Sequence, residues 1–340
     1  MKYRALGNTG IKVSSLALGA MNFGAFGNPD HSDSIRIVHA ALDAGVNLVD
    51  TADVYSLGES EEIIGTALKG RRDQVVLATK AGNPMSDDPN ETGSSRRWLT
   101  RSVESSLRRL KTDHIDLFQV HRPDWATSDA ETLDALTNLQ RAGKILHFGS
   151  STFPAHRMVS SRWAASERGL SPYVTEQPSY SILMRGIESD VLPVAREQGM
   201  GVIVWSPLGA GWLTGAIGRD GATTNRAKAL PSMFDLSQAG NQAKIEAVEK
   251  LTVIAADADL TLIQLALGFV TAHSAVTSAI VGPRTLPHLE SQLAAHDVTL
   301  SDEILDRIDE VVAPGVDLAP NDRFATPVPD LTDARLRRRG

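Results

Sequence analysis

Hydrophobic and polar positions follow two alternating patterns along the chain. Short runs rich in apolar and β-branched residues are separated by longer segments in which apolar residues recur every three or four positions. The short runs are typical of buried strands and the longer segments of amphipathic helices, so their alternation favours βα units and a parallel sheet. The runs that predict strands cover residues 13–19, 46–50, 75–80, 115–121, 145–151, 173–177, 201–206 and 275–282.

The segments between these runs predict helices. Leu99, Val103, Leu107 and Leu110 are four, four and three positions apart, which places them along one face of a helix. Amphipathic segments of this kind cover residues 34–44, 60–69, 98–110, 130–142 and 155–168. Eight strands with crossover helices predict an α/β fold, a closed (β/α)8 TIM barrel, because an open doubly wound sheet usually has fewer strands in one domain.

Segments outside this rhythm predict additions to the barrel. Residues 3–13 indicate a small β-hairpin ahead of the first barrel strand, and two helical patterns, 242–256 and 261–272, precede the last strand, so one helix is extra. A further helix is expected from Ser301 to about Val312. We expect one barrel domain over residues 1–315 and a partly mobile C-terminal segment over 316–340.

Composition narrows the function classes. The 340 residues are 42% hydrophobic and 22% charged, which is typical of a globular protein. The absence of cysteine excludes disulfides, iron–sulfur clusters and thiol nucleophiles. A net charge of −7 argues against nucleic acid as a partner, and no apolar run is long enough for a membrane span. No secretory signal is visible, so we expect a cytoplasmic protein.

Candidate chemistry lies where the predicted strands end. Asp50, Lys80 and His121 each end an apolar run, and Tyr55 follows in the loop after Asp50. Each has a plainer structural interpretation, such as a cap, a surface lysine, a packed ring or a turn. The carboxyl ends of parallel barrel strands meet at one rim, however, and four such residues there favour a functional site.

These four residue types are suited to carbonyl chemistry. Tyrosine is a poor acid at neutral pH, but a neighbouring lysine ammonium favours the phenolate and lowers the tyrosine pKa. A carboxylate can hold the lysine, and a histidine can orient a carbonyl oxygen. The set predicts a proton donor for the oxyanion that forms when hydride attacks a carbonyl. An isomerase or aldolase using Lys80 as a Schiff base is an alternative, whereas the nine histidines show no ligand spacing for a metal hydrolase.

Three segments resemble signatures of the aldo-keto reductase family. They are residues 50–55 (Asp-Thr-Ala-Asp-Val-Tyr), 113–121 and 205–211, and the similarity extends over about residues 3–313. The pattern is closest to the bacterial and potassium-channel β-subunit-like branch. The resemblance implies a barrel that binds NADPH without a Rossmann fingerprint. It also implies Tyr55 as general acid, Lys80 as the group that lowers its pKa, Asp50 as the lysine's partner and His121 as the residue that orients the carbonyl.

The resemblance also implies a cofactor site. Ser151, Thr152 and Gln177 would hold the nicotinamide carboxamide, although many members have asparagine in place of Thr152. Trp205 would stack on the nicotinamide and residues 206–211 would wrap the pyrophosphate. Residues 280–292 match the segment for the 2′-phosphate and adenine, with departures at His288, Ser291 and Gln292. The implied cofactor residues are Gly19, Ala20, Met21, Asp50, Ser151, Thr152, Gln177, Trp205, Ser206, Pro207, Leu208, Gly209, Gly211, Arg226, Gly282, Arg284, His288 and Gln292.

The expected activity is NADPH-dependent reduction of a small aldehyde or ketone to an alcohol, with the hydride from the nicotinamide and the proton from Tyr55. The alternative is a nucleotide-binding regulatory subunit of the potassium-channel β type with slow catalysis. We expect residues 21–23 (Met21, Asn22 and Phe23) to line the substrate pocket, with Trp98 or Trp125 as further candidates. Loops set specificity in this architecture, so these motifs leave the substrate, the reaction direction and the oligomeric state open.

Overall fold

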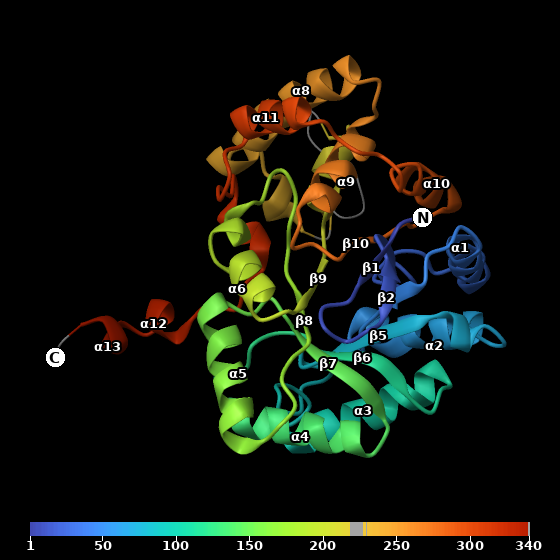
Figure 1. Cartoon of the computed structure of the whole chain (residues 1–340), viewed down its shortest axis with the longest axis vertical. Coiled ribbons are helices and arrows are strands. Elements are labelled where there is room, and N and C mark those ends of the chain that lie inside the picture. The colour runs from blue at the N-terminus through green and yellow to red at the C-terminus, as the bar shows by residue number, and fades with distance from the viewer. Residues whose placement is uncertain (218–226, 229, 339–340) are drawn as a thin grey trace.

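A closed barrel of parallel strands forms the centre of the computed structural model, which describes residues 1–217, 227–228 and 230–338 (Figure 1). Within these residues the barrel has eight strands, each paired with its neighbours in chain order, and the last pairs with the first. The predicted (β/α)8 barrel is therefore confirmed. The strands are β3 (Leu16–Gly19), β4 (Leu48–Asp50), β5 (Val76–Ala81), β6 (Ile115–Val120), β7 (Ile145–Ser151), β8 (Thr175–Gln177), β9 (Gly201–Val204) and β10 (Ser278–Val281).

Helices surround the barrel, and all but α10 and α11, which follow the last strand, lie in the connections between strands (Figure 1). They are α1 (His31–Asp43), α2 (Glu59–Ala67), α3 (Arg96–Leu110), α4 (Asp129–Arg141), α5 (Ala155–Arg168), α6 (Val191–Glu197), α8 (Ala239–Asp257), α9 (Leu262–Ala272), α10 (Leu286–Leu293) and α11 (Asp302–Val311). Two helices, α8 and α9, precede β10 as predicted. Among the described residues no single helix is long and apolar enough to span a membrane. Only α8 and α9 taken together reach the necessary length and apolar composition, and these two helices are bent by 92° relative to each other.

The first predicted strand is wrong in one respect, because the run 13–19 belongs to two different sheets. A hairpin of β1 (Tyr3–Ala5) and β2 (Lys12–Ser14) comes first, and β3 starts only at Leu16. Contacts with other segments cause the break: the backbone N–H of Ser14 donates to Asn47 Oδ1 at 2.7 Å and that of Ser15 donates to the Lys2 carbonyl at 2.9 Å. The hairpin thereby leaves the barrel wall and covers its amino end.

The barrel interior is filled in layers. The buried apolar residues inside it form a cluster separate from the larger core between strands and helices. These residues are Leu6, Val13, Ala17, Leu48, Ala78, Leu117, Ile203 and Ile280. Side chains two positions apart on a strand point to the same face. Asp50, Lys80 and Gln119, each two residues after a member of this cluster, therefore form a polar layer directly above the apolar one.

The chain after α11 returns across the barrel. The Val316 carbonyl accepts from the backbone N–H of Arg185 at 3.0 Å, and the N–H of Leu318 donates to the Leu183 carbonyl at 3.2 Å. Asp322 then forms an ion pair with Lys244 of α8. The last short helices, α12 (Pro329–Thr332) and α13 (Ala334–Arg337), extend away from the barrel (Figure 1). The mobility expected of residues 316–340 stays a prediction.

The inner face of β7 requires a glycine at position 149. A Cβ atom on Gly149 would overlap the Thr175 side chain and lie 2.8 Å from the Thr175 carbonyl oxygen on β8. We expect Gly149→Ala to lower the free energy of unfolding by about 1–3 kcal/mol, the usual result of overpacking. Denaturant unfolding would measure it. Gly282→Ala is a matched control, because its Cβ would meet Asn22 Nδ2 at 3.4 Å; an equal loss in both variants would contradict the prediction.

Candidate active site

A buried ion pair lies in the polar layer of the barrel. Lys80 Nζ donates to Asp50 Oδ2 at 2.6 Å and to the Thr51 carbonyl at 2.7 Å, and both charged residues are almost completely buried. Gln177 Nε2 donates to the other Asp50 oxygen at 2.8 Å. Burial by itself lowers the pKa of Lys80, but its interactions with Asp50 and with Tyr55 outweigh this effect, so the lysine pKa is above its ordinary value. Lys80 is therefore an ammonium at neutral pH.

Tyr55 completes this group from the loop after β4. Its hydroxyl is 3.4 Å from Lys80 Nζ, which also lies 5.0 Å from the centroid of the tyrosine ring. Tyr55 is half-buried, and it begins the short 3-10 helix η1 (Tyr55–Gly58). Ser56 and Leu57 follow it in the left-handed region, at φ values of 48° and 54°. Such conformations are costly for non-glycine residues and are typical of functional loops.

His121 faces Tyr55 from the end of β6. The two rings meet edge to face with their centroids 5.8 Å apart, and Asn83 Nδ2 is 3.3 Å from His121 Nδ1. Burial, followed by the positive charges of Lys80 and Arg122, holds the pKa of His121 well below its usual range. His121 is therefore neutral at pH 7 and can hydrogen-bond to a carbonyl oxygen without adding a charge.

Asp53 is a buried group that the sequence reasoning did not single out. Its two carboxyl oxygens have no hydrogen-bond partner among the described residues. Burial, together with the charge of Glu61, raises the pKa of Asp53 to about 8, against the opposing effects of Arg109 and Lys80. Burial thus favours the protonated form of Asp53. The sequence pointed to Asp53 only through its position inside the segment 50–55, and its burial is evident only from the fold.

The residues expected at the nicotinamide carboxamide lie together at the ends of β7 and β8. Ser151 Oγ donates to the Gln177 carbonyl at 2.8 Å, and the backbone N–H of Thr152 donates to the same oxygen at 3.2 Å. Thr152 has a φ of 58°, and its hydroxyl oxygen accepts from Arg122 Nη1 at 2.6 Å. Thr152 is thus held by Gln177 through its backbone and by Arg122 through its hydroxyl.

The loop after β9 folds into a tight cradle at residues 206–211. Ser206 and Ala210 have φ values of 59° and 58°, and Gly211 has 109°, a value that L side chains rarely adopt. The backbone N–H of Ala210 donates to Ser206 Oγ at 3.0 Å. Trp205, immediately before the loop, has an indole Nε1 without a hydrogen-bond partner among the described residues. Pro207, Leu208 and Gly209 lie within the same loop.

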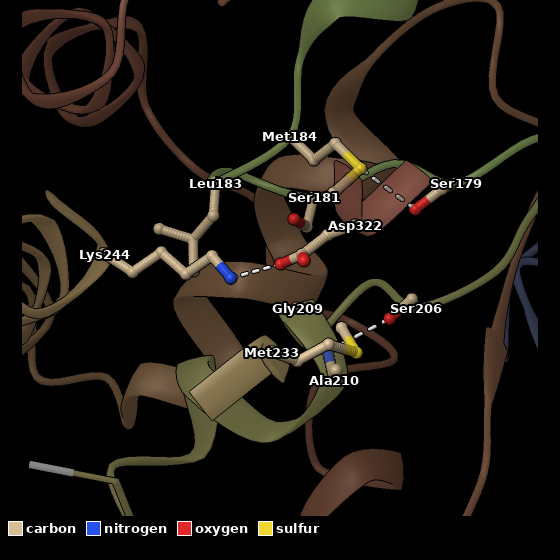
Figure 2. Close-up of a pocket in the computed structure, with 10 residues that line it drawn as sticks. All are labelled: Ser179, Ser181, Leu183, Met184, Ser206, Gly209, Ala210, Met233, Lys244 and Asp322. Atoms are coloured by element: carbon tan, nitrogen blue, oxygen red, sulfur yellow. Dashed lines mark hydrogen bonds and ion pairs between the residues drawn. The ribbon is translucent and has the colours of Figure 1, made fainter. Parts of the chain in front are cut away.

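A cavity of about 10 Å³ lies behind this cradle, lined by Ser206, Gly209 and Ala210 of the loop (Figure 2). It is no larger than one water molecule, so it is not a cofactor or substrate site. Lys244 and Asp322 meet across it, which shows that the C-terminal segment packs against the back of the loop (Figure 2).

The residues expected at the adenosine end lie near the start of α10. Arg284 is half-buried and comes shortly before this helix, and His288 lies in its first turn. Burial, followed by the charge of Arg284, lowers the pKa of His288. Gln292 is buried, and its side-chain oxygen has no hydrogen-bond partner among the described residues. Arg226, a further phosphate candidate, lies outside the described residues.

The end of β3 also carries residues that we expected at the cofactor. Gly19 is its last residue, the backbone N–H of Ala20 donates to the Asp50 carbonyl at 2.8 Å, and Met21 is half-buried. Asn22 Nδ2 donates to the Gly282 carbonyl at 2.7 Å. The expectation that Phe23 lines the substrate pocket is wrong, because its ring is completely buried in the core between strands and helices.

These features fit a dinucleotide. The unpartnered Gln292 oxygen, the free indole N–H of Trp205 and the left-handed cradle are polar or strained features that a ligand would satisfy or use. Among the described residues, no group of three His, Asp or Glu side chains is placed to hold a metal ion.

A family model and several known proteins are similar to this chain over much of its length. A family model described as "Aldo/keto reductase family" matches residues 15–313. The chain is 38% identical to the uncharacterized oxidoreductase YrpG of Bacillus subtilis, over 92% of this chain and 96% of that protein. It is 33% identical to a probable voltage-gated potassium channel subunit beta of Arabidopsis thaliana, over 92% and 97% of the two chains. It is 39% identical to the aldo-keto reductase YhdN of B. subtilis, over 63% and 64%.

The ion pair predicts a specific effect of neutralising Lys80. In Lys80→Met, Tyr55 no longer faces an ammonium, so we expect kcat/KM for carbonyl reduction to fall about a hundredfold or more and its pH dependence to shift. Asp50→Asn should weaken the same coupling, because Lys80 loses the carboxylate that holds its charge and position. Steady-state kinetics at several pH values would measure both. A Lys80→Met enzyme with the pH profile of the wild type would contradict the assignment.

Proposed function

This chain belongs to the aldo/keto reductase family, and we propose that it uses NADPH to reduce an aldehyde or ketone to an alcohol. The observation that carries this proposal is the buried Lys80 ammonium, held by Asp50 at 2.6 Å and directed at the Tyr55 hydroxyl at 3.4 Å. The nicotinamide, when bound, supplies the hydride that attacks the carbonyl carbon. The chain supplies the proton and the electrostatic stabilisation.

The proposed role of each side chain follows from its neighbours. The substrate oxygen lies between the Tyr55 hydroxyl and the neutral His121 ring, and it takes a proton from Tyr55 as negative charge develops on it. The Lys80 ammonium stabilises the phenolate that Tyr55 becomes. Asp50 keeps Lys80 charged in its buried position, and Gln177 keeps Asp50 in place. This is general acid catalysis with a fixed, water-excluded charge next to the acid.

The same observations weigh against a Schiff base on Lys80. A Schiff-base lysine must be a neutral amine to attack a carbonyl, and such lysines have lowered pKa values. The pKa of Lys80 is raised, and its ammonium donates to Asp50 and Thr51. An aldolase or isomerase of this type would also leave Tyr55 without a role.

A regulatory function of the potassium-channel β type is a second candidate, favoured by the similarity to the Arabidopsis relative over nearly the whole chain. This function would use the same Asp50, Tyr55, Lys80 and His121, and it would differ from that of an enzyme in its slower turnover. Single-turnover oxidation of bound NADPH by an aldehyde, compared with steady-state turnover, separates the two. An enzyme turns over many times in the steady state, whereas a regulatory subunit completes one turnover and then slows.

Removal of the Tyr55 hydroxyl tests the proposed acid. Tyr55→Phe deletes the transferable proton and keeps the ring, so we expect carbonyl reduction to fall about a hundredfold to ten-thousandfold. The affinity for NADPH should change little, and fluorescence titration would measure it alongside the rate. Full activity in the purified variant would show that another group donates the proton.

Arg284 is proposed to select NADPH over NADH. Its guanidinium can bind the 2′-phosphate through two parallel hydrogen bonds. Arg284→Ala should therefore weaken NADPH binding by roughly 1.5–3 kcal/mol, the range for hydrogen bonds to charged groups, and leave NADH binding nearly unchanged. Titration of both cofactors by tryptophan fluorescence would measure the difference. Equal losses for the two cofactors would show that Arg284 does not contact the 2′-phosphate.

A further inference from the structure

Arg122 is a cation at the mouth of the barrel that the proposed reaction does not use. It directly follows His121 after β6, and its Nη1 donates to Thr152 Oγ1 at 2.6 Å and to the His121 carbonyl at 3.0 Å. The guanidinium carbon is 5.9 Å from the centroid of the Trp205 ring. Burial lowers the pKa of Arg122, and a Tyr55 phenolate, when it forms, would oppose that lowering. Arg122 therefore lies among residues that follow four different barrel strands, around the reacting centre.

Arg122 has hydrogen-bonding capacity to spare. A guanidinium has five N–H donors, and the two contacts above use Nη1 alone. Among the described residues, no carboxylate forms an ion pair with it. Glu176 is near enough to act on it electrostatically, but the Glu176 oxygens accept from Ser150 Oγ at 2.5 Å and from the Phe153 N–H at 3.0 Å.

Two other half-buried arginines of this chain have carboxylate partners. Arg157 pairs with Asp129 at 2.7 Å, and Arg72 pairs with Asp116 at 2.7 Å. Taking a charge out of water without a partner is costly, so buried charges are normally paired. The described residues provide no hydrogen-bond partner for Nε or Nη2 of Arg122, so this edge of the guanidinium is the part that is open to an anion.

Building on the proposed function, we propose that Arg122 binds the carboxylate of the carbonyl substrate, so that the preferred substrates are aldehyde or keto acids. The planar guanidinium edge matches a carboxylate through two parallel hydrogen bonds. Lys80, the other cation near Tyr55, already donates to Asp50 and Thr51. One free positive charge matches a single negative charge, which favours a carboxylate over a doubly charged phosphate.

The test compares each acid with its uncharged ester. The probes are 3- and 4-carboxybenzaldehyde and their methyl esters, assayed with NADPH. We expect the wild type to prefer the acids, and Arg122→Met to lower the acid-to-ester ratio of kcat/KM at least tenfold, mainly through KM. Arg122→Lys should retain part of the preference for acids, because lysine keeps the positive charge but cannot form the two parallel hydrogen bonds of a guanidinium. Arg101→Met is the matched control, since Arg101 is an exposed arginine of α3 paired with Glu91, and its ratio should stay that of the wild type.

A second readout does not depend on turnover. Calorimetric titration of benzoate, with benzamide as the uncharged comparison, into the NADP⁺-loaded protein should show benzoate binding in the wild type and its loss in Arg122→Met. If the wild type reduces no aldehyde, the proposed function fails, and benzoate binding alone decides the role of Arg122. An unchanged ratio, an equal loss for acid and ester, or undiminished benzoate binding in the variant would overturn the proposal. Where Arg122→Met does not fold, Arg122→Gln replaces it.

Discussion

The burial of the Lys80 ammonium is the constraint on which the site depends. Moving such a charge out of water costs several kcal/mol unless its partners are closely placed. The barrel supplies Asp50 Oδ2 from the adjacent strand β4 and the carbonyl of Thr51, the residue that follows β4, and Gln177 holds the other Asp50 oxygen from β8. A slip of one residue between β4 and β5 would turn Asp50 or Lys80 out of the barrel. The apolar residues below them, Leu48 and Ala78, therefore secure the chemistry as well as the core.

The charges around this pair are arranged so that few remain uncompensated. Burial keeps His121 neutral and raises the pKa of Asp53 to about 8 and that of Glu176 to about 7, which reduces the negative charge that both carboxyls would otherwise carry. Lys80 and Asp50 compensate each other. Arg122 is the group at this mouth that keeps a charge without an ion-pair partner among the described residues, and it lies on the side of Thr152 and Trp205. The site thus separates a proton-donating centre from a face that can recognise an anion.

Much of this could be predicted from the sequence, for physical reasons. The apolar periodicity predicted the barrel, and Asp50, Lys80 and His121 were found because the ends of parallel strands must meet. Other features depend on contacts between distant segments. The run 13–19 divides between two sheets because Ser14 bonds to Asn47, which the local pattern does not show. The burial of Phe23 and Asp53, and the bond from Arg122 to Thr152 across β6 and β7, likewise appear only when the chain is folded. The roles assigned to the cofactor residues stay predictions.

The protonation state of Lys80 tests the central claim most directly. Nitrogen-15 NMR of protein labelled at lysine, with the Lys80 signal assigned by its absence in Lys80→Met, reports whether Nζ is an ammonium or an amine. The account predicts an ammonium that persists to a pH above about 10, the ordinary range for lysine, because Asp50 holds the charge in place. A Lys80 that becomes an amine below about pH 8, as a Schiff-base lysine would, would contradict it.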